Sequence, residues 1–220
     1  MTSIDNLARL NSEIPASVNL VVVTKNQSPA RIQELYDAGQ RVFGENKVQE
    51  LLSKVDRLPS NIAWHFIGHL QRNKVKFITP FITLIHSIDS LRLLEEVNDE
   101  ASKVNRIIEC LLQFHIASEE TKYGLDLPEG VALLGSPSYK GMKHIKITGI
   151  MGIATLTDDS TLIEREFGNL ISIYRHLKKT FFPLNSAFRE ISMGMSGDYR
   201  LAIRQGSTMI RVGTMIFGGN

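Results

Sequence analysis

The sequence has very little cysteine and no excess of charge of one sign. Its single cysteine, Cys110, cannot form an intramolecular disulfide, and the apolar run around it predicts a buried core residue. The 25 Lys and Arg nearly balance the 23 Asp and Glu, which leaves a net charge of +2. This balance argues against nucleic acid or an anionic membrane as the main partner. Because possible metal ligands do not cluster in the sequence, no metal site is expected.

Long apolar runs are also absent. None approaches the roughly 20 residues that a membrane-spanning helix needs. Residues 1–8 lack the basic region and apolar core of a signal peptide, so we expect a cytoplasmic protein. The hydrophobic content of 43% is ample for a core, and 220 residues fit one domain better than two.

Short apolar runs alternate with helical patterns along the whole chain. The expected strands are residues 20–23, 41–46, 62–67, 81–85, 106–116, 144–150, 188–193 and 207–212. A short amphipathic helix over residues 4–10 precedes the first strand. This order predicts a single α/β domain over residues 1–220, folded as a (β/α)8 TIM barrel. A doubly wound open sheet is the alternative.

The first expected strand ends at a lysine. Ser28 and Pro29 have the residue types of an N-cap and a first helical position, so Lys25 lies between a buried strand and the next helix. Barrels of this kind bind ligands at the carboxyl ends of their strands. An apolar interior disfavours the charged ammonium, so the amine becomes more available as a nucleophile toward carbonyls. A solvated loop lysine is the ordinary alternative.

Small residues and hydroxyls follow the last two expected strands. Ser196 follows the seventh strand, and Gly213 and Thr214 follow the eighth. Backbone N–H groups at such turns bind phosphate, although ordinary turns have the same composition. Arg211 is expected to face the barrel interior, where its guanidinium needs an acceptor. That acceptor is either a ligand or a buried carboxylate such as Glu45.

An amine, a phosphate cradle and a guanidinium together favour a phosphorylated aldehyde as the ligand. Pyridoxal 5′-phosphate fits, held as a Schiff base on Lys25 with Arg211 against its ring nitrogen. An arginine there cannot keep that nitrogen protonated, which weakens the cofactor as an electron sink. A barrel that binds another phosphorylated ligand without a covalent bond is an alternative.

Several blocks of the sequence resemble the pyridoxal phosphate homeostasis protein family. They are residues 23–25, 43–50, 64–74, 86–89, 122–124, 149–152 and 192–218. The fold of that family is similar to the N-terminal barrel of bacterial alanine racemase. The resemblance implies that these residues bind the cofactor: Lys25, Asn46, Met193, Ser196, Arg211, Gly213 and Thr214.

Within that set, the resemblance implies phosphate contacts from Ser196, Gly213 and Thr214. Asn46 and Met193 are expected to line the pocket. The roles of His69, Ser87 and Lys122 stay open. Two departures from the family pattern are Lys47, where tyrosine is usual, and His115, where asparagine is more usual.

A racemase needs two bases, one on each face of the substrate. In alanine racemase the second base is a tyrosine from a separate β-domain of the partner subunit, whereas this chain ends soon after the expected eighth strand. Its tyrosines, at positions 36, 123, 139, 174 and 199, fall in outer helices or loops. We therefore expect a monomeric, non-enzymatic protein that buffers pyridoxal phosphate and delivers it to apo-enzymes, with indirect effects on amino-acid and keto-acid balance. A pyridoxal phosphate-dependent amino-acid racemase is the alternative.

Overall fold

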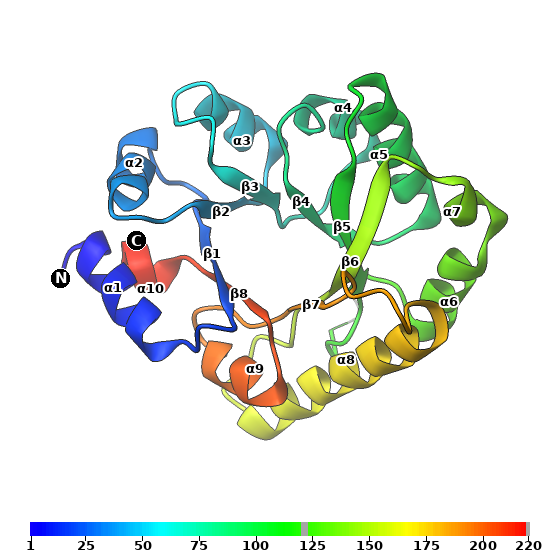
Figure 1. Cartoon of the computed structure of the whole chain (residues 1–220). Coiled ribbons are helices and arrows are strands. Elements are labelled where there is room, and N and C mark those ends of the chain that lie inside the picture. Colours follow the sequence, from blue (N-terminus) through cyan, green and yellow to red (C-terminus); the bar gives the residue numbers. More distant parts are fainter. Residues whose placement is uncertain (120–122, 219–220) are drawn as a thin grey trace.

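The computed structural model describes residues 1–119 and 123–218, and in these residues eight parallel strands close into a barrel in chain order (Figure 1). The strands are β1 (Asn19–Val23), β2 (Val42–Glu45), β3 (Ala63–Phe66), β4 (Leu84–Ile88), β5 (Ile108–Phe114), β6 (Ile145–Gly152), β7 (Glu190–Ser192) and β8 (Met209–Val212). Pairing of Val21 with Arg211 and of Val22 with Val212 closes the barrel between β1 and β8. The predicted barrel is confirmed, and the open-sheet alternative is wrong.

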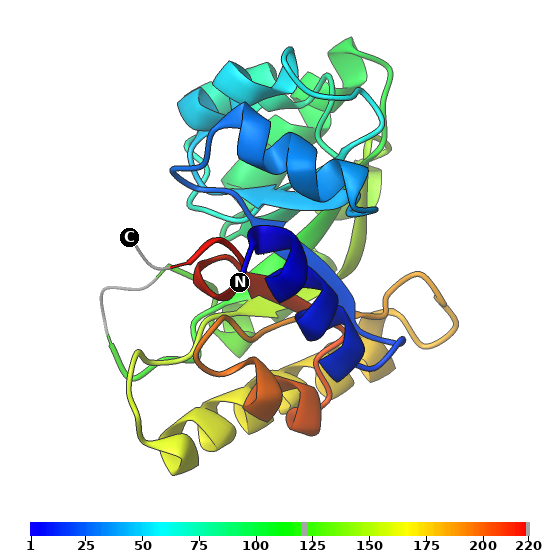
Figure 2. The ribbon, with the colours of Figure 1, turned by 90° about the vertical axis from the view of Figure 1, so that its left-hand side faces the viewer.

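Helices surround the barrel and connect its strands (Figure 1). They are α1 (Ser3–Glu13), α2 (Pro29–Asp37), α3 (Val48–Val55), the 3-10 helix η1 (Arg72–Lys74), α4 (Val75–Ile78), α5 (Leu91–Lys103), α6 (Leu127–Gly135), α7 (Pro137–Gly141), α8 (Ser160–Phe181), α9 (Tyr199–Gln205) and α10 (Thr214–Phe217). The turned view shows α1 beside α10 (Figure 2), where the Asn6 amide donates to the Ile216 carbonyl at 3.1 Å. None of the helices in the described part of the chain has both the length and the hydropathy of a membrane span.

Local sequence signals set several of the helix ends. Ser28 caps α2 by accepting the Arg31 N–H, and Pro29 occupies the first helical position, as predicted. Gly206 ends α9 as its C-cap, in a left-handed conformation with φ of 103° that glycine accommodates without strain. The Ser28–Pro29 signal thus ends the loop at the carboxyl end of β1, where the candidate site lies, whereas Gly206 precedes β8 at the opposite end of the barrel.

The core has two layers, as expected when strands alternate their side chains between two faces. Inside the barrel, Val21, Leu84, Leu111, Met151 and Met209 form one apolar cluster. A larger cluster, which includes Leu20 and Val22, packs the outer face of the strands against the helices. Cys110 is fully buried in this larger cluster, which confirms its predicted place in the core.

The fourth strand lies further along the chain than the sequence pattern predicts. Residues 81–85 were the expected strand, but Phe81 belongs to the turn after α4, where its N–H donates to the Ile78 carbonyl. The strand β4 therefore includes His86 and Ser87, which the sequence pattern placed in a loop. Likewise β6 extends to Gly152. Both shifts move polar or small residues from the loops into the barrel wall.

Candidate functional site

Lys25 lies in the turn directly after β1, with an exposed side chain. A cavity of about 120 Å³ opens beside it, between this turn and the start of α10. The residues that line it are Val23, Lys25, Asn26, Gln27, Gly213, Thr214, Phe217 and Gly218. Because β1 pairs with β8, the structure brings the predicted amine together with two of the residues predicted to bind phosphate.

Gly213 approaches the backbone of β1 closely. A Cβ atom at this position would lie 2.9 Å from the Val23 carbonyl oxygen and 3.1 Å from the Val23 Cβ. The position therefore excludes a larger side chain and allows the chain after β8 to pack closely against β1. The first N–H groups of α10 have no acceptor within the helix, and such groups suit an anion. Gly213 and Thr214 thus have the chemistry predicted for a phosphate turn.

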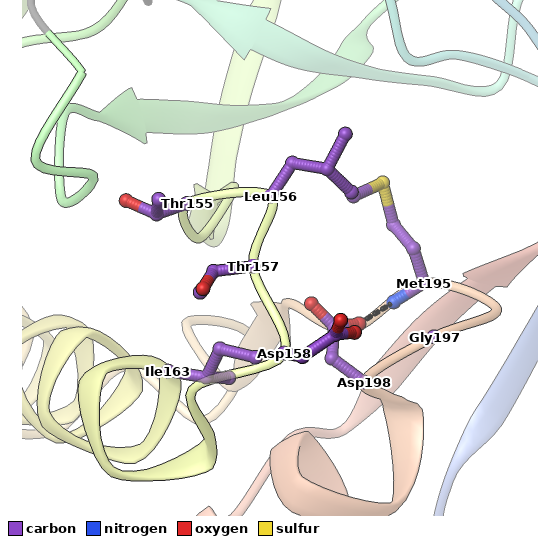
Figure 3. Close-up of a pocket in the computed structure, with 8 residues that line it drawn as sticks. All are labelled: Thr155, Leu156, Thr157, Asp158, Ile163, Met195, Gly197 and Asp198. Atoms are coloured by element: carbon purple, nitrogen blue, oxygen red, sulfur yellow. Dashed lines mark hydrogen bonds between the residues drawn. The ribbon is translucent and has the colours of Figure 1, made fainter.

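The turn after β7 borders a different cavity, of about 280 Å³ (Figure 3). The Met195 N–H donates to Asp198 Oδ1 at 2.5 Å, which closes the turn around the half-buried Ser196. Met195, Gly197 and Asp198 line this cavity from one side, and the loop from Thr155 to Asp158 lines it from the other. Ser196 lines neither cavity. Two aspartates at the larger cavity disfavour an anion there.

Arg211 is buried inside the barrel and donates to two acceptors of the protein. Its Nη1 lies 2.6 Å from Ser192 Oγ, and its Nη2 lies 3.1 Å from the Gly152 carbonyl oxygen. The inward position agrees with the prediction, but Glu45 is not its partner, because Glu45 pairs with Lys54. Burial lowers the pKa of Arg211 to about 10. The guanidinium therefore stays charged at neutral pH.

Two buried histidines extend this contact into a chain of hydrogen bonds across the barrel. Ser192 Oγ lies 3.0 Å from His86 Nδ1, and His86 Nε2 lies 3.0 Å from His65 Nδ1. Since arginine can only donate, Ser192 accepts from Arg211 and is free to donate its own proton to His86. With that proton on Ser192, a neutral His86 carries its own proton on Nε2 and donates to His65. Arginine fixes the direction of the first bond, and the histidine tautomers fix the direction of the other two.

Both histidines of this chain are held neutral. Burial lowers the pKa of His65 to about 4. Burial also lowers the pKa of His86 well below its ordinary value, and the neighbouring His65 and Arg211 add to this effect. His65, His86 and Ser192 were not predicted from the sequence as members of the site. The available signal was Arg211 itself, since a guanidinium inside a barrel requires buried acceptors.

Two polar side chains near the ends of β2 and β4 are buried without a partner. In the described part of the chain, Asn46 Oδ1 and Ser87 Oγ are shielded from solvent and make no hydrogen bond. Buried polar atoms are nearly always paired, so each is a candidate contact for a bound group. Met193 is fully buried in the larger core cluster and lines neither the cavity beside Lys25 nor the one beside Asp198.

Two other residues whose roles the sequence left open are His69, at the rim of the barrel, and Lys122. His69 Nδ1 pairs with Asp89 Oδ2 at 3.2 Å, and the His69 ring stacks on Tyr123 with 3.9 Å between centroids. Lys122 lies outside the described residues. Across the residues that are described, no three His, Cys, Asp or Glu side chains gather in an arrangement that could hold a metal ion.

Comparison with known proteins identifies the relatives of this chain. Residues 4–220 match the family described as alanine racemase, N-terminal domain. The chain is 36% identical to the pyridoxal phosphate homeostasis protein of Aquifex aeolicus, over 90% of this chain and 86% of that protein. It is 38% identical to the protein of the same name from Synechocystis sp., over 93% of each.

Solved structures agree with these relatives. PipY of Synechococcus elongatus, solved with pyridoxal phosphate bound, is 36% identical, with a TM-score of 0.88 over 99% of this chain and 100% of that one. Alanine racemase of Bartonella henselae shares the fold, with 18% identity and a TM-score of 0.75 over 98% of this chain and 60% of that one. The chain therefore belongs to the pyridoxal phosphate homeostasis protein family.

Proposed function

We propose that this protein binds pyridoxal 5′-phosphate and acts in the homeostasis of that cofactor, with Lys25 as the residue that holds it covalently. The observation that carries the proposal is the cavity shared by Lys25 and the Gly213–Thr214 turn. An amine and an anion-binding turn around one space suit a phosphorylated aldehyde. The name of the relatives and the ligand in the PipY structure support the same assignment.

The residues present fit this group. Gly213 and Thr214 line the cavity beside Lys25, and N–H groups at the start of α10 suit a phosphate there. Asn46 Oδ1 is a buried acceptor still without a partner in the described chain. When bound, the cofactor supplies an aldehyde and a pyridine ring. We assign Lys25 to the aldehyde carbon, Gly213 and Thr214 to the phosphate, and Arg211 to the ring nitrogen; these contacts are proposals.

The other predicted contacts are also proposals. Ser196 would add to the phosphate contacts from the turn after β7, and Asn46 and Met193 would belong to the pocket lining. We further propose that residues 1–220 act as one domain, and that the protein buffers the cofactor and passes it to apo-enzymes. Monomeric state and cytoplasmic location stay predictions.

Substitution of Lys25 tests the proposed function. We expect purified protein mixed with pyridoxal phosphate to gain the visible absorbance of a cofactor joined to an amine, and the Lys25→Ala variant to lose it. Borohydride reduction followed by peptide mass spectrometry should locate the label on Lys25. The matched control is Lys140→Ala, which removes an exposed lysine from α7 and should keep the band. A label on another side chain, or a colourless wild-type protein, would disprove the assignment.

Most tyrosines of the described chain are poorly placed to serve as a second base. The Tyr199 hydroxyl donates to Glu13 Oε2 of α1 at 2.6 Å, so Tyr199 packs helices together, as predicted. Tyr36 donates to Asn61, and Tyr174 donates to the Phe188 carbonyl. Tyr123, by contrast, is exposed and stacks on His69 at the rim of the barrel. The hydroxyl contacts of Tyr199, Tyr36 and Tyr174 favour a carrier, which binds and passes on the cofactor, over a racemase.

Deuterium exchange distinguishes the carrier from the racemase. With alanine or serine in heavy water, we expect the loaded protein to incorporate label at Cα no faster than free pyridoxal phosphate does, because the hydroxyls of Tyr36, Tyr174 and Tyr199 are bonded elsewhere. The measurement is proton NMR of the amino acid over time. Faster exchange that the Tyr123→Phe variant abolishes would establish a catalytic role and defeat the carrier proposal.

A further inference from the structure

We propose that Lys54, with Glu45 and Glu50, forms a positioning network that fixes the backbone on both sides of Lys25. The inference deepens the proposed function, because it rests on Lys25 as the residue that holds the cofactor. Lys54 lies on α3 and is only 3% exposed, which is unusual for a lysine. Its ammonium is surrounded by acceptors from three different segments of the chain.

The contacts of Lys54 use the full donor capacity of its ammonium. Nζ lies 2.5 Å from Glu45 Oε2, 2.7 Å from Glu50 Oε1 and 2.8 Å from the Thr24 carbonyl oxygen. A lysine ammonium has three N–H donors, so these three acceptors occupy all of them. Two of the acceptors are the carboxylates that neutralise the buried charge, and the third is the peptide group directly before Lys25.

The same network reaches the peptide group after Lys25. Glu50 Oε1 accepts the N–H of Asn26, and Asn26 adopts a left-handed conformation with φ of 60°. Asparagine tolerates that region better than most residues, but the conformation still needs support from its surroundings. Both neighbours of Lys25 are therefore bonded to one cluster of charges, while the lysine side chain itself is left exposed toward the cavity.

Glu45 connects this cluster to the end of β2. Its Oε2 accepts the Thr24 hydroxyl at 3.0 Å, and its Oε1 accepts the Asn46 N–H at 3.1 Å. Burial raises the pKa of the Glu45 carboxyl, and contact with Lys54 opposes that rise. The network thus sets the position of Lys25 and of Asn46, two residues proposed to contact the cofactor, relative to each other.

A role in stability alone does not explain these contacts. A buried ion pair is costly to desolvate, and apolar side chains of similar volume often stabilise a protein as well or better. An apolar residue in place of Lys54 would lose the bond to Thr24 and leave Glu50 without its cation. The feature that only this charged cluster provides is the fixed backbone on both sides of Lys25.

Substitution of Glu50 tests the inference, because this side chain is partly exposed and its loss should spare the fold. We expect Glu50→Ala to slow attachment of pyridoxal phosphate to Lys25 by about tenfold, since a misplaced nucleophile loses reactivity steeply. Glu50→Gln keeps an oxygen acceptor and should restore most of the rate. Gln49→Ala, an exposed neighbour on α3, is the matched control and should react like the wild type.

Attachment is followed by visible absorbance and by borohydride trapping, and melting of the cofactor-free proteins reports the fold. Lys54→Gln is a second variant and should also slow attachment, without a matching loss of affinity for a phosphorylated pyridoxine that lacks the aldehyde. Attachment to Lys25 at the wild-type rate in Glu50→Ala and Lys54→Gln would overturn the positioning role and leave the proposed function intact. No attachment in the wild type would overturn the proposed function instead.

Discussion

Acidification from pH 6.5 to pH 4 is expected to lower the free energy of unfolding by roughly 3 kcal/mol through His65 alone. Burial holds the pKa of His65 at about 4 in the folded protein, against 6.5 for an unperturbed histidine. Each pKa unit of difference corresponds to about 1.4 kcal/mol. Below pH 6.5 the unfolded chain binds a proton at His65 that the folded protein does not bind. The contribution of His65 to stability therefore decreases as the pH falls from 6.5 to 4, and it is constant at higher pH.

The neighbouring His86 acts in the same direction, because burial also lowers its pKa. Glu45 acts in the opposite direction, since its raised pKa favours the folded state at low pH. A comparison of variants separates these contributions. Urea unfolding of the wild type across this pH range should show stability rising with pH, and His65→Gln should show a shallower rise. His176→Gln, which removes an exposed histidine from α8, should keep the wild-type slope. An unchanged slope in His65→Gln would contradict the buried, neutral state of His65.

Gly149→Ala is expected to destabilise the protein by about 3 kcal/mol, in the upper range for an overpacked core. An alanine Cβ at this position on β6 would lie 1.9 Å from the Glu190 carbonyl oxygen on β7. Backbone cannot move aside as a flexible side chain can, so the two strands would have to separate. The pairing of β5 with β6 is already irregular here, since Cys110 pairs with Ile147 and the next residue, Leu111, pairs with Gly149.

Gly168→Ala is the matched control for this substitution. Gly168 lies in α8, and apart from its own helix turn and its chain neighbours no atom lies within 4 Å of the position that its Cβ would take. Alanine in a helix interior should stabilise the protein by about 0.5–1 kcal/mol, because glycine loses more backbone entropy on folding. Thermal and urea unfolding of both variants give the comparison. Equal stability of the two variants would show that β6 and β7 have room that the structure does not indicate.

The sequence pattern was sufficient to predict the barrel, because the signals for strands and caps are local. The run from Leu20 to Val23 and the Ser28–Pro29 helix start depend only on neighbouring residues, and both are found in the structure. The fourth strand was misplaced because an apolar segment around Phe81 satisfies the same pattern as a strand. Only the turn after α4 and the pairing with β3 and β5 decide the register.

The chain of hydrogen bonds inside the barrel could not be predicted from local sequence patterns, because its members come from different strands. His65, His86, Ser192 and Arg211 lie on four different strands, and each hydrogen bond joins residues far apart in the sequence. Lys54 was missed because a lysine on a helix normally faces solvent. By contrast, Lys25, Gly213 and Thr214 could be brought together from the sequence, since the fold itself dictates that the first and last strands are neighbours.

The one-way hydrogen bonding at Arg211 has a consequence for how tightly a ligand can bind. A guanidinium has five N–H groups in one plane, and two of them are already given to Ser192 and to the Gly152 carbonyl. The plane of the group is thereby set in advance, and its remaining edge has a defined direction. A molecule that meets this edge does not have to restrict a freely rotating side chain, so less entropy is lost on binding. For such a molecule, rigidity that Arg211 acquired during folding would add to affinity.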